Sequence, residues 1–304
     1  CDGRHTPGVA AKTQGLWDGR STLNTVVANG LVIGAIYGLV ALGLTLVYKK
    51  SRVLNFAHGE VGMVGAFVFY VAFVERHLPY LVAALIGVTV SAGLGCLTFL
   101  LLSRRRNDPL NMLIGTLAVA GTLTFVANEI WGPDQHFVPP PLAGVSLNVA
   151  GLHFVGPRLL VLIAALVLAV AFFVLFRTTH VALLFRASAA DPYAASLMGI
   201  DVTRLDVATW TVAGALAGLA AILVAPLVGF DIFFMTLLAI RGFAAALLAG
   251  LTNVSGALAA GLALGLAEAA LTRQTTQPGL PEAVLVVLVV GFLLRPQATV
   301  RRTA

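Results

Sequence analysis

Charged residues, lysine and cysteine are scarce in this chain. Only 11% of its 304 residues are Asp, Glu, Lys or Arg, whereas soluble proteins have about 25%, so an ordinary soluble domain is excluded. Two cysteines, Cys1 and Cys96, cannot form a disulfide framework. The three lysines are Lys12, Lys49 and Lys50, and none follows the glycine of a G-x-x-x-x-G-K-[ST] loop. The chain therefore cannot itself hold and hydrolyse ATP.

Patterns that carry catalysis are missing as well. The sequence has no H-E-x-x-H, no paired His/Cys metal spacing and no G-x-S-x-G. We therefore expect no catalytic residue, no metal site and no cofactor bound by this chain. The net charge is +6, but no basic cluster is interleaved with aromatic residues, so nucleic acid is not an expected partner.

Long apolar runs are what the chain has instead. Hydrophobic residues make up 59% of it, and the mean hydropathy is +0.96. Since one crossing of a bilayer needs about 20 apolar residues, the sequence predicts an all-α polytopic integral membrane bundle of about eight to ten transmembrane helices. Nine stretches are candidate spans: 23–48, 57–74, 80–102, 110–131, 159–176, 207–229, 232–251, 254–272 and 282–294. The second, the seventh and the last are short or polar enough to be broken or re-entrant helices.

The distribution of cations predicts the orientation, because Lys and Arg near span ends stay in the cytoplasm. With the amino terminus outside, twelve cations fall inside and six outside, and Arg241 lies within the membrane. The inside set is Lys49, Lys50, Arg52, Arg104, Arg105, Arg106, Arg177, Arg186, Arg204, Arg295, Arg301 and Arg302. The outside loop 132–158 contains Pro139–Pro141, which predicts a stiff, extended segment.

The first polar cluster is the stretch from Asn55 to Glu60, with Phe56 and His58, at the start of an apolar run. Polar side chains there need a partner or a cavity. Asn55 is a candidate helix cap, and His58 and Glu60 are candidates for hydrogen bonds to neighbouring helices. A broken helix that contacts substrate, or a cytoplasmic gate, are the alternatives.

A second singular residue is Arg241, in the middle of the seventh apolar run. A guanidinium at that depth costs about 2.5 kcal/mol or more unless it finds an acceptor or water. Glu268, backbone carbonyls at a helix break and a substrate carboxylate are candidate partners, and a position near the membrane boundary is a further alternative. Carboxylates inside spans are scarce, essentially Glu268 with Glu60 and Glu129, which weakens a carrier driven by an ion gradient.

Small residues recur at helical spacing in two settings. Gly30, Gly34 and Gly38, and likewise Gly214 and Gly218, have the four-residue spacing that lets helix backbones approach closely in lipid. In the loop 177–206, small residues one helical turn apart predict a short helix with an exposed face that docks another protein. The residues singled out in this loop are Arg186, Ala187, Asp191, Ala195, Gly199 and Ile200.

At these residues the sequence resembles the permease subunits of branched-chain amino acid ABC importers. Gly34–Tyr48, followed by Leu54-Asn-Phe-Ala-His-Gly-Glu60, looks like the opening signature of one of the two permease types. Further matching segments are Leu113–Thr116, Arg186-Ala187, Leu197–Ile200, Ala213–Gly218, Gly256-Ala257 and Arg295–Gln297. The resemblance covers about 25–297.

The resemblance implies a subunit of the bacterial inner membrane that pairs with a second, similar permease. It also implies two cytoplasmic ATP-binding subunits, which use the ATP, and a periplasmic protein that delivers leucine, isoleucine or valine. The chain then divides into a polar tail (1–21), a permease domain (22–297) with the coupling loop 177–206, and a carboxyl-terminal tail (298–304). Permeases of this family for urea, amides or other small solutes, and a secondary transporter or channel that needs no ATPase, are the alternatives.

Overall fold

The computed structural model describes residues 19–105, 108–142, 144–149, 152–274, 287 and 291. The expected span 282–294 lies outside these residues except at two positions, and the tail 298–304 lies wholly outside them. The first helix begins at Gly19, inside the stretch predicted as an amino-terminal tail.

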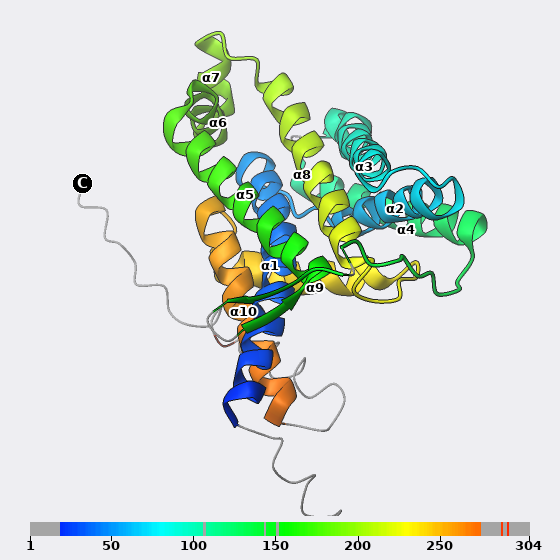
Figure 1. The fold of residues 1–304 in the computed structure, drawn as a ribbon. Coiled ribbons are helices and arrows are strands. Elements are labelled where there is room, and N and C mark those ends of the chain that lie inside the picture. The colour runs from blue at the N-terminus through cyan, green and yellow to red at the C-terminus, as the bar shows by residue number, and fades with distance from the viewer. Residues whose placement is uncertain are drawn as a thin grey trace, which may run out of the picture.

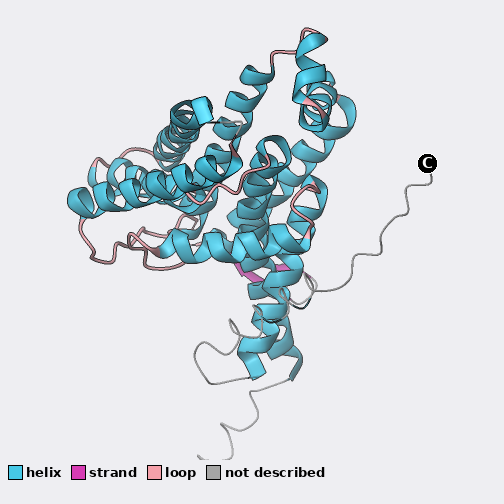
Figure 2. Ribbon diagram, turned by 180° about the vertical axis from the view of Figure 1, so that it is seen from behind, coloured by secondary structure: helices cyan, strands magenta, loops and turns pink. Residues whose placement is uncertain are grey.

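The described residues are almost entirely helical (Figure 1, Figure 2). The long helices are α1 (Gly19–Ser51), α3 (Tyr80–Leu102), α4 (Pro109–Trp131), α5 (Gly156–Thr178), α8 (Val202–Val224) and α10 (Val254–Gln274). The shorter ones are α2 (His58–Tyr70), continued by the π-helical turn η1 (Val71–Glu75), then η2 (Ser103–Arg105), α6 (His180–Ala190), α7 (Pro192–Leu197) and α9 (Phe234–Leu248). The strands are β1 (Ser146–Val149) and β2 (Leu152–Val155).

Seven helices of the described part are long and apolar enough to cross a membrane: α1, α2 with η1, α3, α4, α5, α8 and α10. This confirms a polytopic helical membrane protein. The expected span 232–251 is α9, whose 15 residues extend about 22 Å, too short to cross about 30 Å of hydrocarbon alone. The expected span 207–229 is α8, which begins earlier than predicted, at Val202.

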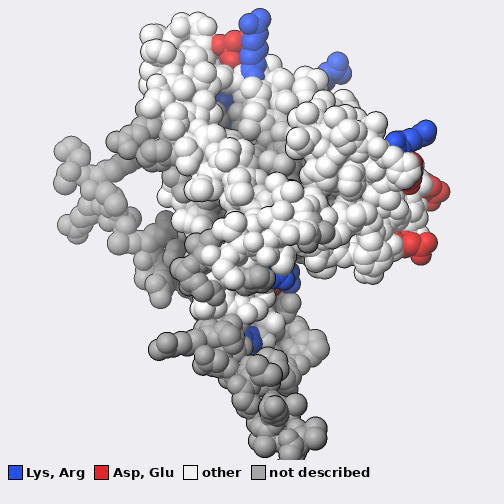
Figure 3. Space-filling model, in the orientation of Figure 1, with Lys and Arg blue, Asp and Glu red and all other residues white. Residues whose placement is uncertain are grey.

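Helix α1 lies at the centre of the bundle. In α1, 89% of an apolar 18-residue stretch is buried inside the protein. The corresponding share is 17% in α4 and 6% in α5. The outer helices carry many exposed apolar side chains, such as Leu85, Leu117 and Leu166, and most of the face seen in Figure 3 is uncharged. Such a surface is suited to lipid, because lipid tails are as apolar as these side chains.

The glycine spacings lie at two helix contacts. Gly30, Gly34 and Gly38 of α1 face α10, and a Cβ added to Gly34 would lie 2.7 Å from the Cα of Leu262. On α8, a Cβ at Gly214 would lie 2.4 Å from the carbonyl oxygen of Ser91 in α3, and one at Gly218 would lie 2.4 Å from the hydroxyl oxygen of the same serine. Only glycine allows the backbones to approach this closely.

The strands β1 and β2 form an antiparallel hairpin that the sequence did not predict beyond an extended loop. In Figure 1 it lies at the end of the bundle opposite α6 and α7. The preceding loop is tied to the α8–α9 connection by a bridge between His136 and Phe230. Both rings pack against Phe67 of α2, at centroid distances of 5.2 and 5.1 Å. Aromatic packing thus attaches this loop and the α8–α9 connection to α2.

Candidate functional site

The segment between α1 and α2 enters the bundle as non-helical chain. Residues 52–57 contain no helix, and the ring of His58 lies against Gly43, where an added Cβ would be 2.5 Å from its Cε1. Gly43 lies about two turns before the end of α1, or about 12 Å along its axis. Helix α2 therefore begins inside the bundle rather than at its surface.

Asn55 organises this non-helical segment. Its side-chain oxygen Oδ1 accepts a hydrogen bond from the backbone N–H of Ala57 at 3.1 Å, and its carbonyl accepts one from the N–H of His58 at 3.4 Å. The N–H of Phe56 donates to the hydroxyl of Thr116 at 3.3 Å. Backbone outside helices is tolerated in a membrane only where such partners exist. Asn55 is not itself the cap residue, since that position is Ala57.

The start of α2 faces α9 across a polar seam, which we define as Phe56, Glu60, Thr236 and Phe243, whereas the ring of the neighbouring His58 faces α1. The hydroxyl of Thr236 donates to Glu60 Oε1 at 2.9 Å, and the rings of Phe56 and Phe243 lie 5.3 Å apart. His58 is 1% exposed and Glu60 is 6% exposed. Among the described residues, neither ring nitrogen of His58 nor Glu60 Oε2 has a hydrogen-bond partner. Buried polar atoms of this kind call for water or a polar ligand.

Arg241, on the same short helix α9, forms a cluster with two other helices. Its Nη2 lies 3.4 Å from Oε1 of Glu268 in α10. The hydroxyl of Tyr37 in α1 donates to Oε2 of Glu268 at 2.7 Å, and the Arg241 guanidinium lies 5.8 Å from the Tyr37 ring centroid. The structure thus pairs Arg241 with Glu268, one of the partners considered from the sequence. Tyr37 was not foreseen, because a tyrosine in an apolar span carries no local signal of its partner.

Replacing Tyr37 with phenylalanine should lower the free energy of unfolding by about 1.5–3 kcal/mol, because the variant loses a hydrogen bond to a charged acceptor. Tyr80 supplies a matched control, since its hydroxyl is buried and has no hydrogen-bond partner among the described residues. Tyr80→Phe should leave stability unchanged or raise it. Thermal unfolding in one detergent compares the two variants, and equal effects would contradict the Tyr37–Glu268 hydrogen bond.

The expected coupling loop folds into α6 and α7, which project from one end of the bundle (Figure 1). Asp191 caps α7, because its Oδ1 accepts from the N–H of Ala194 at 2.9 Å. Gly199 ends the helix with a φ of +79°. The N–H of Ile200 donates to the carbonyl of Ala195 at 3.1 Å, the bond that closes a Schellman motif. Asp191, Gly199 and Ile200 therefore build the ends of α7.

The docking face predicted for this loop was wrong at Ala195, which is 5% exposed and packs inward. The exposed apolar side chains of α7 and its end are instead Tyr193, Leu197 and Met198, which are 73%, 71% and 83% exposed. We call these three residues the α7 tip. Arg186 and Ala187 are also exposed, but they lie on α6 and are not part of the α7 tip. The predicted boundary of the loop was also wrong at Asp206, which is buried within α8.

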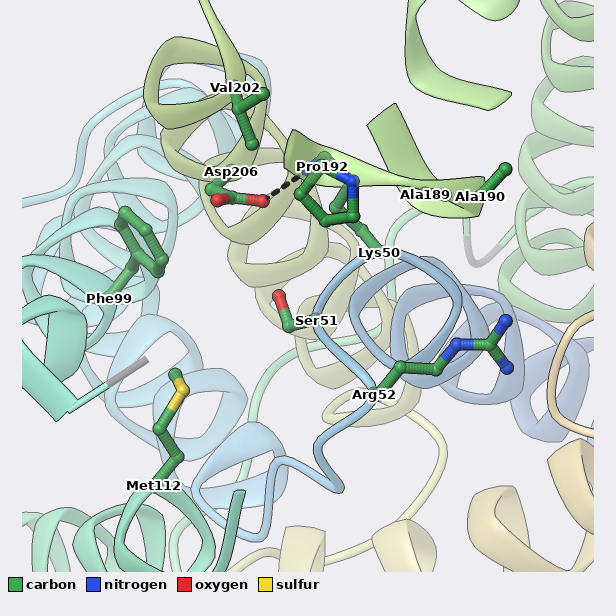
Figure 4. Close-up of a pocket in the computed structure, with 10 residues that line it drawn as sticks. All are labelled: Lys50, Ser51, Arg52, Phe99, Met112, Ala189, Ala190, Pro192, Val202 and Asp206. Atoms are coloured by element: carbon green, nitrogen blue, oxygen red, sulfur yellow. Dashed lines mark ion pairs between the residues drawn. The ribbon is translucent and has the colours of Figure 1, made fainter. Parts of the chain in front are cut away.

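A buried ion pair joins the ends of α1 and α8 beneath α6 and α7. Lys50 Nζ lies 2.7 Å from Asp206 Oδ1, and their side chains are 1% and 9% exposed. The pair borders a cavity of about 280 Å³ whose wall includes Phe99, Met112 and Pro192 (Figure 4). In the close-up, Lys50 and Asp206 point toward one another while Arg52 points away from them. Sequence reasoning missed this pair because its members are far apart along the chain.

The sequence matches a known protein family. The family model described as branched-chain amino acid transport system / permease component matches residues 26–294. The chain belongs to this permease family. The permease is 32% identical over 268 residues to a probable branched-chain amino acid transport permease protein LivH of Methanocaldococcus jannaschii, which covers 81% of this chain and 80% of the relative.

Two further relatives carry similar names. Protein BraD of Pseudomonas aeruginosa, a high-affinity branched-chain amino acid transport system permease protein, is 29% identical over 80% of the permease and 84% of its own length. LivH of Escherichia coli strain K12 is 26% identical over 88% of the permease and 94% of its own length. No solved structure matches the permease significantly. Family and apolar helices together make it a multi-pass protein of the inner membrane.

The structure separates the predicted site residues of the permease into two groups. The pathway candidates Asn55, Phe56, His58 and Glu60 lie just before and at the start of α2, and Arg241 on α9 forms an ion pair with Glu268 on α10. The coupling candidates lie on α6 and α7. Helix α9 contacts both the seam and the Arg241 cluster, so the first group shares one short helix.

Proposed function

We propose that this permease is the membrane-spanning subunit of an ATP-driven importer for branched-chain amino acids. The observation that carries the proposal is the exposed apolar α7 tip, present on a bundle whose sequence has no ATP-binding loop. An apolar tip that projects from the membrane is suited to bind a separate protein. Family membership and the names of the relatives support the substrate.

The partners follow from the same proposal. The complex contains two ATP-binding subunits, which use the ATP; one of them docks at the α7 tip, while a second, similar permease completes the pathway. A periplasmic binding protein delivers leucine, isoleucine or valine at the end that carries the hairpin. The chain itself binds no cofactor and performs no covalent chemistry, and its role is to open the pathway alternately to the two sides.

The pathway, in this proposal, passes the polar seam and the Arg241 cluster on α9. An amino acid brings an ammonium and a carboxylate into the membrane, and both need polar partners there. Glu60 has one carboxylate oxygen without a protein partner among the described residues, which suits an ammonium. Arg241, 31% exposed on its side chain, suits a carboxylate, because guanidinium binds carboxylates with two hydrogen bonds.

Replacing both Leu197 and Met198 with aspartate should release the ATP-binding subunits. Burial of two such side chains stabilises a complex by about 3 kcal/mol or more, so binding should weaken roughly 100-fold. Co-purification of ATP-binding subunits with the tagged permease measures this directly, together with uptake of radiolabelled leucine. Leu147→Asp in β1, where leucine is 49% exposed at the opposite end, is the matched control and should retain the ATP-binding subunits.

The outcome separates the proposed function from its alternatives. Normal uptake by the Leu197→Asp/Met198→Asp variant would contradict docking at the α7 tip. Uptake by the purified chain alone in liposomes, abolished by an ionophore, would instead show a carrier driven by an ion gradient. Uptake of urea or amides in preference to leucine by the complete complex would replace the substrate but keep the mechanism.

A further inference from the structure

Three cations gather at the end of the bundle that carries α6 and α7. Lys49, near the end of α1, is within electrostatic reach of Arg52 and of Arg186 in α6. Arg52 and Arg186 are exposed. Within the described ranges, no carboxylate lies at ion-pair distance from any of the three. We call Lys49, Arg52 and Arg186 the cation cluster, and its like charges repel one another unless an anion binds between them.

An apolar groove adjoins the cation cluster. It has a volume of about 100 Å³ and lies between α1, α5, α6 and α8. Side chains that line it include Leu46, Phe172, Phe176, Phe185 and Leu205. Its lining is almost wholly apolar, so it favours a hydrocarbon occupant over water.

One contact and two sequence relations connect the groove with the cation cluster. The Lys49 ammonium lies 6.0 Å from the centroid of the Phe176 ring, which lines the groove. Leu46, another lining residue, precedes Lys49 by three positions and so shares its face of α1. On α6, Phe185 lines the groove and is followed directly by Arg186. A charged surface thus continues directly into an apolar slot.

This arrangement lies at the boundary of the membrane. The candidate spans of α1 and α5 end at Ser51 and Phe176, so the cation cluster is at the level where lipid headgroups begin. Below it, Val174 and Leu175 of α5 and Val181 of α6 expose apolar side chains, 48%, 37% and 54% respectively. A soluble partner bound to the cation cluster would not reach these side chains on its membrane side. The acyl chains of a lipid whose headgroup binds the cluster would cover them.

We propose that this surface binds one anionic phospholipid of the cytoplasmic leaflet. The phosphate contacts Lys49, Arg52 and Arg186, and part of one acyl chain occupies the apolar groove. Because the site joins α6 to α1 and α5, the lipid clamps the base of α6. The inference goes beyond the proposed function and holds whatever solute the permease carries, since it needs only the membrane position of the chain.

The test measures retained lipid on the intact transporter complex. The complex is purified from nanodiscs with equal amounts of phosphatidylglycerol and phosphatidylcholine, and bound lipid is counted by native mass spectrometry. The wild-type complex should retain phosphatidylglycerol in preference to phosphatidylcholine. Each cation near an anionic lipid contributes roughly fivefold in affinity, so Arg186→Gln should weaken retention about fivefold and the triple variant with Lys49→Gln and Arg52→Gln more strongly.

Arg204→Gln is the matched control, because Arg204 is a cation of the same end that pairs with Asp201 at 2.9 Å instead of belonging to the cluster. It should retain phosphatidylglycerol as the wild type does. As a second readout, phosphatidylglycerol should raise the unfolding temperature of the wild-type complex but not that of Arg186→Gln.

Three results would overturn the proposal. The first is equal retention of the two lipids by the wild-type complex. The second is unchanged retention by the triple variant, and if that variant instead lost a protein subunit, the cation cluster would be a protein interface. The third is displacement of phosphatidylglycerol by excess inorganic phosphate, which would show a simple anion site that does not use the groove.

Discussion

Replacing Lys50 with methionine should lower the free energy of unfolding of the permease by about 3–5 kcal/mol, because removal of one partner of a buried ion pair takes away the attraction that offsets the cost of burying the other charge. Asp206 would remain as a carboxylate that is 9% exposed on its side chain, without the ammonium now 2.7 Å away. Asp206→Leu should have an effect of the same size. Denaturant unfolding in detergent, followed by the fluorescence of the three tryptophans, of which Trp210 lies one turn from Asp206, measures both.

The double variant Lys50→Met/Asp206→Leu decides whether the ion pair is responsible. Apolar replacement of both members of a buried pair is often neutral for stability, so the double variant should recover most of what either single variant loses. Arg204→Gln removes a cation whose side chain is 88% exposed, and such surface pairs contribute little. Losses that simply add in the double variant would refute a direct interaction between Lys50 and Asp206.

Gly265→Ala is expected to be one of the most damaging single-methyl changes in the core of the permease. The added Cβ would lie 2.3 Å from both the Cα and the nitrogen of Gly34. Overpacked cores usually lose about 1–3 kcal/mol, and a clash with backbone on both sides cannot be relieved by a side-chain rotation, so we expect about 3 kcal/mol or more. Size-exclusion chromatography of a fluorescent fusion should show little folded protein.

Gly93→Ala and Gly121→Ala are the matched controls for this change. Both glycines lie in transmembrane helices, α3 and α4, and nothing lies within 4 Å of a Cβ placed on either. Alanine also has the higher helix propensity, so both variants should fold at wild-type levels. Equal yields for Gly265→Ala and Gly93→Ala would contradict the contact between α1 and α10.

The sequence was sufficient to predict seven of the nine expected spans, because a helix that crosses lipid needs a long apolar stretch, and such a stretch is visible in the sequence. The stretch 232–251 forms only the short helix α9, and 282–294 lies outside the described residues except at two positions. One further error lies where a polar residue belongs inside. Asp206 suggested a loop, since its charge interrupts the apolar run, yet α8 begins before it and Lys50 neutralises it. The hairpin at Ser146–Val155 was missed because its pairing depends on two short segments with weak alternation.

In the candidate site, unusual residues could be recognised from the sequence, but their contacts with residues far along the chain could not. Arg241 and Glu268 were recognisable as unusual charges within apolar runs, and their pairing was one of several alternatives. Tyr37, which donates to Glu268, and Thr236, which donates to Glu60, carry no such signal. The small residue Ala195 was expected on an exposed face, but helical spacing alone does not say which face of a short helix turns inward.

The packing of α1 against α10 has a consequence for biogenesis. Tyr37 and Glu268 are 231 residues apart, and ribosomes add roughly 5–20 residues per second, so α1 waits about 12–46 seconds in the bilayer before its partner is synthesised. During that interval the face of α1 that carries Gly30, Gly34 and Gly38, and the Tyr37 hydroxyl, lack their contacts with α10. Truncated chains that stop before α10 lack these contacts and should be substrates for membrane quality-control proteases.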